Sequence, residues 1–220
     1  MTYPITIIDN FFEDPDAIVN WALSLDYHRP ETGNWPGIRS KMMHELGERE
    51  DRFFQYFGEK VHMLFHDSSP DYWNMQTHFQ RILPFSEEKY DPLNRGWIHQ
   101  DLDTQFGGIV YLTKDPEPDT GTSIYKSNIG FAIQFAQELK MKEALYKGEE
   151  FDLDEYYSAY EKAHEQYEET VKISNVYNRF VLFNSKTHHG VQTFGTKERL
   201  TLNFFGLQMT GKIPPLLRYQ

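Results

Sequence analysis

GWIHQD at residues 96–101, followed by FGGIVYL at residues 106–112, is the stretch that decides how this chain is interpreted. Side chains in an extended segment alternate between two faces, so residues two apart point the same way. His99 and Asp101 can therefore contact one common ion. A metal site needs at least one more protein ligand, which has to come from another part of the chain.

Composition limits what that ligand can be. The chain has 220 residues, which favours a single domain over residues 1–220, and it contains no cysteine. Disulfides, thiolate zinc sites, iron–sulfur clusters and a cysteine nucleophile are therefore excluded. Any metal must be bound by histidine, aspartate or glutamate.

The formal net charge of -11 argues against nucleic acid or an anionic membrane as the main partner, because both attract a basic surface. Residues 1–8 lack the basic and long apolar regions of a signal peptide, and no apolar run approaches the roughly 18 residues of a membrane span. We therefore expect a cytoplasmic protein that acts on a small-molecule, peptide or protein substrate. The sequence leaves its oligomeric state open.

Apolar spacing predicts helices in the first half of the chain and in one later segment. Asp14 before Pro15 is typical of a helix start, and this helix is expected to continue to about Leu25. Residues 40–65 predict one long or two short helices, whereas residues 28–40 are rich in proline and glycine and predict a loop. Residues 131–172 predict a helical insertion with an acidic, solvated face.

Apolar runs and alternating patterns predict strands mostly in the second half. The expected strands cover residues 5–8, 73–83, 99–112, 122–126, 178–183 and 199–205. Short strands separated by turn residues indicate a β-sandwich or barrel with helices packed outside. The predicted class is therefore mainly β with flanking helices (α+β).

Two adjacent histidines are candidates for the third ligand. His188 and His189 follow the apolar strand at 180–183, whereas the other candidates lie in predicted helices or the early loop: His28, His44, His62, His66 and His164. Two histidines and one carboxylate on one face of an iron ion leave three positions open for a bidentate cosubstrate and dioxygen. Zinc is the rival metal for the same ligands.

A later strand offers a site for a carboxylate. Arg199, Thr201 and Asn203 share one face of the strand at 199–205, opposite its leucines and phenylalanine. The guanidinium group provides a fork of donors and the hydroxyl of Thr201 adds another, which favours a carboxylate clamp. The alternative is that Arg199 forms a salt bridge at the rim.

Five motifs taken together resemble the Fe(II)/2-oxoglutarate-dependent dioxygenases, with the prolyl-4-hydroxylase-like branch closest. They are WIHQD (97–101), IVYLTK (109–114), NRFVLF (178–183), HGVQ (189–192) and ERLTLNFF (198–205). The resemblance covers about residues 75–207 and implies a double-stranded β-helix (jelly-roll) core there. Residues 1–70 would then be N-terminal helical support.

The resemblance also implies roles for individual residues. His99, Asp101 and His189 would bind Fe(II), His189 being preferred over His188 because it stands two residues before Val191. Arg199 would bind the distal carboxylate of 2-oxoglutarate, helped by Thr201 and Tyr111.

The implied reaction consumes O2 and 2-oxoglutarate, releases succinate and CO2, and hydroxylates an unactivated C–H bond, with ascorbate as a reductant. A prolyl residue, an amino acid and a small metabolite are all candidate substrates. The strand ending at Pro84 lacks a tyrosine that some prolyl hydroxylases use, which weakens the prolyl assignment. The insertion at 131–172 is longer than the minimal core and could form a substrate lid.

Two other functional classes stay open. One is a non-catalytic, cupin-like jelly roll that binds a metal or a ligand and uses Arg199 structurally. The other is an interaction protein that acts through the acidic insertion.

Several further residues have two interpretations each. His78 either lines the metal pocket or is an ordinary histidine, and Arg39 either meets a substrate carboxylate or anchors its loop. Trp97 is expected in the core, with stacking on a substrate as its alternative, and Asp103 is expected in a turn, with metal binding in place of Asp101 as its alternative. Core packing is also the ordinary explanation for the aromatic stripe formed by Tyr156, Tyr157 and Tyr160.

Overall fold

The computed structural model describes residues 5–45, 47–64, 70–101, 103–128 and 136–211. Its helices are α1 (Pro15–Leu23), α2 (Glu48–Met63), α3 (Ala136–Lys147) and α4 (Leu153–His164), with short 3-10 turns at Met43–Glu45 and Pro92–Asn94. Its strands are β1 (Ile5–Ile8), β2 (Tyr27–His28), β3 (Ile38–Ser40), β4 (Pro70–Ile82), β5 (Phe106–Tyr111), β6 (Thr122–Ser127), β7 (Tyr167–Ile173), β8 (Phe180–Asn184), β9 (His188–Val191) and β10 (Arg199–Gly211).

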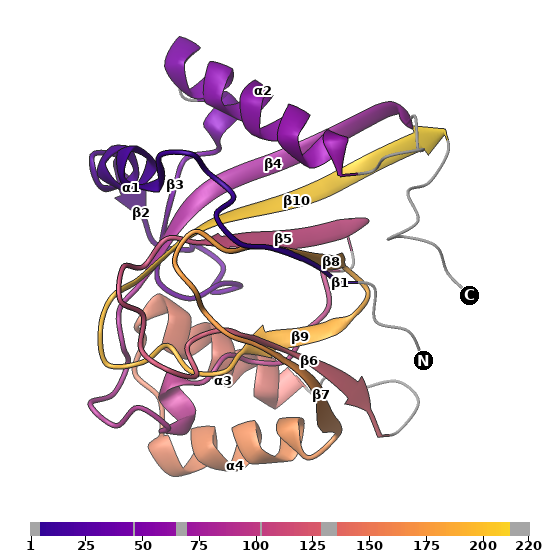
Figure 1. Cartoon of the computed structure of the whole chain (residues 1–220). Helices are drawn as coiled ribbons and strands as arrows, with labels where there is room; N and C mark the ends of the chain where they lie inside the picture. The colour runs from indigo at the N-terminus through magenta and orange to yellow at the C-terminus, as the bar shows by residue number, and fades with distance from the viewer. Residues whose placement is uncertain (1–4, 46, 65–69, 102, 129–135, 212–220) are drawn as a thin grey trace.

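The strands form two facing antiparallel sheets (Figure 1). The larger sheet has the order β1-β8-β5-β10-β4-β3-β2, and the smaller has the order β7-β6-β9. A bridge between His99 and His189 adds the segment before β5 to the edge of the smaller sheet. From β4 onward the chain passes repeatedly between the two sheets, which is a jelly roll. The predicted double-stranded β-helix is thus confirmed.

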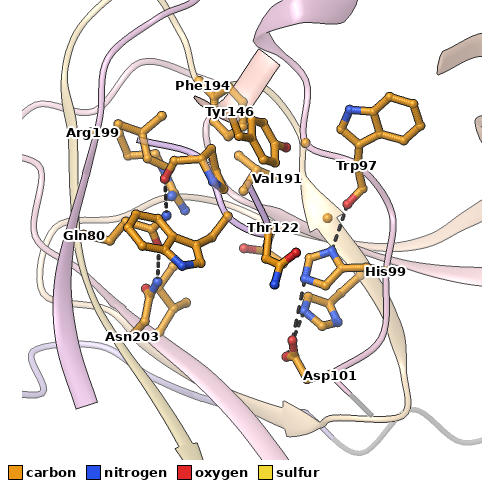
Figure 2. A pocket seen from close by; sticks show the side chains of 18 of the residues that line it. Gln80, Trp97, His99, Asp101, Thr122, Tyr146, Val191, Phe194, Arg199 and Asn203 are labelled. Atoms are coloured by element: carbon orange, nitrogen blue, oxygen red, sulfur yellow. Dashed lines mark hydrogen bonds and ion pairs between the residues drawn. The ribbon is translucent and has the colours of Figure 1, made fainter. Parts of the chain in front are cut away.

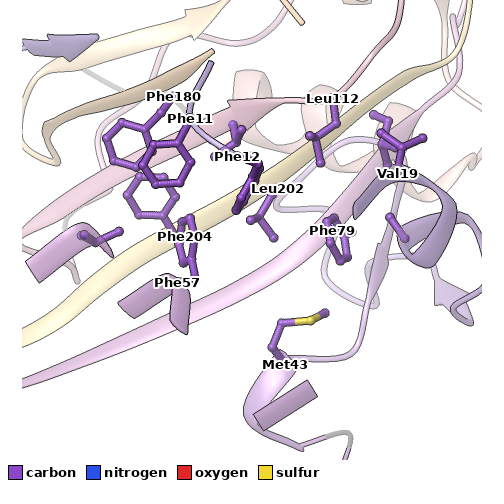
Figure 3. Close-up of a cluster of buried hydrophobic side chains, with 14 of the residues drawn as sticks. Phe11, Phe12, Val19, Met43, Phe57, Phe79, Leu112, Phe180, Leu202 and Phe204 are labelled. Atoms are coloured by element: carbon purple, nitrogen blue, oxygen red, sulfur yellow. The ribbon is translucent and has the colours of Figure 1, made fainter. Parts of the chain in front are cut away.

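Alternation along β10 separates the site from the outer core. Leu200, Leu202 and Phe204 point to the outer face of the larger sheet, which α1 and α2 cover (Figure 1). In Figure 3 the ring of Phe204 lies among those of Phe57 and Phe180, with ring centroids 5.2 and 5.0 Å away. The opposite face of β10, which carries Arg199, is turned toward the smaller sheet.

Helices α3 and α4 form a second layer on the other side of the molecule, beside the smaller sheet (Figure 1). Their aromatic residues pack inward: Tyr156 and Tyr160 are buried, and the indole N–H of Trp97 donates to the Tyr156 hydroxyl at 3.1 Å. The predictions of helix packing for this stripe and of a core position for Trp97 are confirmed, with Tyr157 only partly buried.

The structure differs from the sequence predictions in three segments. Residues 28–40 are not all loop, because β3 pairs with β4 and β2 pairs with β3. Residues 167–173 form strand β7, not helix; their polar residues suit an edge strand that pairs on one side with β6. The predicted strand at 99–112 is interrupted, because the Asp101 N–H donates to the Ser185 carbonyl and a turn follows.

Some predicted segments extend beyond the described residues. Positions 131–135 of the insertion, Phe65 at the end of the second helical region and Leu102 of the predicted strand at 99–112 lie outside them. Within the described part of the chain, α2 is one long helix, as one of the two alternatives predicted. No helix there has the length and apolar character needed to cross a membrane.

The outer core gives a test of the fold. Leu202 is fully buried under α1 and α2, whereas Leu83, just past β4, is 60% exposed. Leu202→Ala should lower the free energy of unfolding by about 2–5 kcal/mol through lost apolar contact and a residual cavity. The same change at Leu83 should cost less than about 0.5 kcal/mol. Urea denaturation of both variants measures the difference, and equal losses would contradict this core.

Candidate metal centre

Three predicted ligands meet between the two sheets. His99 and Asp101 come from the segment before β5, and His189 comes from β9. Asp101 Oδ1 lies 3.7 Å from His99 Nε2, and its Oδ2 lies 3.4 Å from His189 Nε2. The ligand atoms all lie within 4.8 Å of one another, so one ion can contact all three. Figure 2 shows the imidazole of His99 and the Asp101 carboxylate on the same side of the cavity.

Backbone hydrogen bonds hold the two histidines in register. The His99 N–H donates to the His189 carbonyl, and the His189 N–H donates to the His99 carbonyl, each at 2.9 Å. Each ring then turns its Nδ1 toward the carbonyl two residues earlier, that of Trp97 for His99 and that of Thr187 for His189, both at 2.8 Å. A carbonyl only accepts, so the neutral rings carry their protons on Nδ1. Their Nε2 lone pairs are left facing Asp101, as metal binding requires.

The electrostatics favour the metal-binding forms of His99 and Asp101, whereas at His189 the effect of burial is outweighed by Asp101, which raises the pKa of this ring, so that a bound cation would displace its proton. Burial and the neighbouring His189 lower the pKa of His99, which keeps this ring neutral. Burial alone would raise the pKa of Asp101, but the hydrogen bond and charge interaction with His189 outweigh it and hold that pKa below its usual range. An ionised carboxylate and neutral imidazoles are the forms that ligate a cation.

The three side chains line one cavity of about 290 Å³ between the sheets. Gly107 lies close against the Asp101 carboxylate, because a Cβ atom there would lie 3.1 Å from Asp101 Oδ2. The rest of the wall is largely apolar and aromatic, including Trp97, Tyr146, Phe183 and Phe194. A polar constellation inside a mostly apolar cavity is the usual form of a small-molecule site.

Arg199 lies on another side of this cavity (Figure 2). Its side chain is 3% exposed, its Nε donates to the Thr120 carbonyl at 3.1 Å, and its guanidinium lies 5.5 Å from the centre of the Tyr111 ring. Its Nη2 is buried with no hydrogen-bond partner. Burial lowers the pKa of Arg199, although Tyr111 opposes that shift. The alternative of a rim salt bridge is wrong, because the group is buried and no described carboxylate pairs with it.

Of the two predicted helpers of Arg199, Thr201 is held by another partner, whereas Tyr111 interacts with both Arg199 and Thr122. The Thr201 hydroxyl donates to Asn203 Oδ1 at 3.0 Å, and the Tyr111 hydroxyl donates to Thr122 Oγ1 at 2.8 Å. Asn203 and Thr122 themselves line the cavity. Sequence reasoning placed Asn203 on the right face without giving it a role, and Thr122 was missed because a strand-initial threonine carries no distinctive signal.

A third side of the cavity comes from β3, β4 and α3. Gln80 accepts a hydrogen bond from Asn203 and donates to the Pro36 carbonyl at 2.6 Å. Arg39 reaches Gln80 Oε1 at 3.4 Å, and Lys142 enters from α3. Lys142 was missed by sequence reasoning, because nothing in a charged helix indicates which lysine faces a cavity.

The other residues that the sequence offered as candidates for the site do not join the three predicted metal ligands. The ring of His188 packs against Tyr167 instead, with centroids 5.0 Å apart, and Asp103 is an exposed turn residue as predicted. His78 faces Asn203 across β4 and β10 but borders a neighbouring cavity, and its ring stacks on Phe205. Both of its nitrogens are buried with no hydrogen-bond partner.

Comparisons with known proteins agree with this architecture. The model of DUF6445, a family of unknown function, matches residues 1–205, and no curated protein matches the chain. Solved structures match over nearly the whole chain. HygX from Streptomyces hygroscopicus with nickel, 2-oxoglutarate and hygromycin B bound has a TM-score of 0.60 at 12% identity, covering 97% of this chain and 93% of that chain.

Two further solved structures are similar. A Pseudomonas putida prolyl-4-hydroxylase has a TM-score of 0.51 at 13% identity, covering 94% of each chain. The non-haem α-ketoglutarate-dependent epimerase SnoN from nogalamycin biosynthesis has a TM-score of 0.54 at 10% identity, covering 94% of this chain and 78% of that chain. The chain thus has the fold of 2-oxoglutarate-dependent Fe(II) oxygenases, prolyl-4-hydroxylase included. The resemblance predicted from the motifs is confirmed at the level of the fold.

The metal centre predicts that His99 is needed for metal binding and that His188 is not. His99→Ala should abolish stoichiometric Fe(II) binding, because it removes one of three ligands, whereas His188→Ala should retain it, because that ring contacts Tyr167. Metal content after anaerobic loading and desalting measures both. Retained metal in the first variant, or lost metal in the second, would contradict this assignment.

Burial of His78 predicts a pH dependence of stability. Burial and nearby Arg39 hold the pKa of His78 far below 6.5, so below about pH 6.5 the unfolded chain gains a proton that the folded chain does not. Folding stability should therefore fall with decreasing pH by up to about 1.4 kcal/mol per pH unit from this group.

His78→Gln should flatten that loss between pH 6.5 and 5, as measured by denaturant unfolding at each pH. His44→Gln, a change on the partly exposed 3-10 turn, is the matched control and should leave the slope as in the unmodified protein. A slope unaffected by the His78 change would argue against a neutral, buried ring.

Proposed function

The chain belongs to DUF6445, a family of unknown function, and from the geometry of its site we propose that it is an Fe(II)- and 2-oxoglutarate-dependent oxygenase. The observation that carries the proposal is the buried, unpartnered Nη2 of Arg199 on the wall of the cavity that holds His99, Asp101 and His189. A metal-ligand set and a carboxylate receptor in one cavity suit a chelating keto acid.

The donor set supports iron as the metal. Two imidazoles and one carboxylate on one face leave open positions for a bidentate cosubstrate and O2. HygX, which has the same fold, has been crystallised with iron and with nickel and 2-oxoglutarate. Zinc fits the same ligands, and the carboxylate receptor supports the choice of iron.

Arg199 supports 2-oxoglutarate as the cosubstrate. A buried guanidinium without a carboxylate partner is costly, so the protein gains stability when a ligand supplies the missing charge. The distal carboxylate of 2-oxoglutarate would accept from Nη2 while its keto acid end faces the metal ligands. Thr122 and Asn203 border the same place and would help to orient it.

Bound Fe(II) would supply the activation of O2 with oxidation of 2-oxoglutarate to succinate and CO2, and ascorbate would keep the metal reduced. The chain itself holds the ligands in register through the His99–His189 bridge and excludes water with the apolar cavity wall. The expected outcome is hydroxylation of an unactivated C–H bond in a small molecule, an amino acid or a prolyl residue.

The experiment that tests this function distinguishes metal binding by the His/Asp ligands from 2-oxoglutarate binding by Arg199. Protein incubated with Fe(II), ascorbate and 2-oxoglutarate should release succinate slowly even without its primary substrate. Arg199→Ala should weaken 2-oxoglutarate binding by about tenfold or more, as expected for loss of a charge-assisted hydrogen bond, and should keep the metal.

Arg179→Gln is the matched control, because Arg179 pairs with exposed Asp9 on the outside of the sheet. That variant should bind 2-oxoglutarate like the unmodified protein. Absence of both succinate release and 2-oxoglutarate binding in the Fe(II) protein would overturn the proposed function and leave a non-catalytic metal-binding jelly roll.

A further inference from the structure

We propose that the primary substrate of this site is an anion whose carboxylate or phosphate group is bound by Arg39 and Lys142. The inference rests on the oxygenase function proposed above and adds a substrate class to it. It starts from the charged side chains that line the cavity. Their positive charges exceed the negative charges, and the metal and the cosubstrate together do not remove this excess.

Among the residues that the structure describes, the cavity wall carries three cations and one carboxylate. Arg39, Lys142 and Arg199 face Asp101, while His99 and His189 are neutral as metal ligands. The two charges of Fe(II) cancel those of the two carboxylates of 2-oxoglutarate, and Asp101 offsets one cation. Two positive charges of the cavity wall are then left unmatched. Unmatched charge in a partly enclosed cavity is unfavourable, so a substrate that carries negative charge binds best.

Arg39 is fixed in a position to receive an acidic group. Its guanidinium stacks over the Trp35 ring at 4.3 Å, and its only hydrogen bond among the described residues is a long one of 3.4 Å to Gln80. The Nε atom is buried with no partner. Burial lowers the pKa of Arg39 to about 9, partly opposed by Asp101, so the group is charged at neutral pH. The stack fixes the orientation of the guanidinium, which leaves its donors available to a ligand.

Lys142 brings the second cation from a different element. It lies on α3, and burial lowers its pKa while Glu143 and Asp101 act in the opposite direction. The loop before β3 lies directly against α3: a Cβ on Gly33, whose φ is +72°, would come within 2.7 Å of the Glu143 carbonyl oxygen. Arg39, just after this loop, and Lys142, on α3, therefore reach the same cavity from two segments that contact each other.

The positive charge of this cavity wall is opposite in sign to the net charge of the whole chain. The chain has a formal net charge of -11, so a general attraction for anions does not explain a cationic cavity wall. Local positive charge focused in a cleft with apolar walls raises the local concentration of an anionic ligand. The aromatic residues beside the cations, Trp35, Tyr146 and Phe194, suit an anion with an apolar or aromatic body.

A binding experiment with simple probes tests the inference. The protein is loaded with Mn(II) in place of Fe(II) and saturated with 2-oxoglutarate, and benzoate, phenyl phosphate and neutral benzamide are titrated by calorimetry. At least one of the two anions should bind about tenfold more tightly than benzamide, and the better one identifies the acidic group. Arg39→Gln and Lys142→Gln should each weaken that anion about five- to tenfold and leave benzamide unchanged.

Lys126→Gln is the matched control, because Lys126 forms an exposed ion pair with Glu168 on the edge of the smaller sheet. Its anion binding should be unchanged. Two variants on separate elements protect the test against a local folding defect in one of them. Anions that bind no more tightly than benzamide, that are indifferent to both variants, or that displace 2-oxoglutarate would overturn the inference.

Binding of 2-oxoglutarate to the Mn(II) protein is measured first in the same instrument. Its absence would overturn the oxygenase proposal and this inference with it. Intact 2-oxoglutarate binding without a preference for anions would overturn the substrate class alone.

Discussion

The pair of backbone hydrogen bonds between His99 and His189 is the constraint on which the site depends. These two bonds attach the segment before β5 to the edge of the smaller sheet, although ninety residues of chain separate their partners. They also fix which carbonyls receive the Nδ1 protons, and so which nitrogens face Asp101. A shift of one residue in this register would turn a histidine out of the site, because neighbouring side chains on a strand point to opposite faces.

The larger sheet, which packs on both of its faces, supplies the opposite wall of the site. The outer face of β10 buries Leu202 and Phe204 under α1 and α2, and the inner face presents Arg199 and Asn203 to the cavity. The same alternation that builds the core therefore positions the polar side chains. Arg199 is buried without a carboxylate partner among the residues that the structure describes. Its Nε donates to the Thr120 carbonyl, while its Nη2 remains available to a ligand.

The cavity wall comes from elements far apart in the chain. Arg39 stands on a short strand next to the edge strand β2 of the larger sheet, and Lys142 stands on the insertion that follows β6 of the smaller sheet. Both contribute a cation to a cavity in a protein that is acidic as a whole. Such a wall would give the insertion a part in selecting the substrate, beyond covering the hydrophobic residues beneath it.

The sequence by itself determined the local part of this protein. The two-residue spacing of His99 and Asp101 and the alternating strands were enough to predict two ligands and a β-sandwich or barrel. His189 as the third ligand and the jelly roll were implied by the resemblance of the motifs to the dioxygenases. Strand β7 was mistaken for helix, because an edge strand needs apolar residues on one face only and its glutamates look like a solvated helix.

Only the tertiary structure decided the rest. Whether Thr201 turns to Arg199 or to Asn203, whether Arg199 is paired or alone, and which lysine of α3 reaches the cavity all depend on contacts between residues distant in sequence. A linear pattern specifies the direction of a side chain relative to its own backbone. What lies opposite that side chain is set by the packing of the sheets and helices.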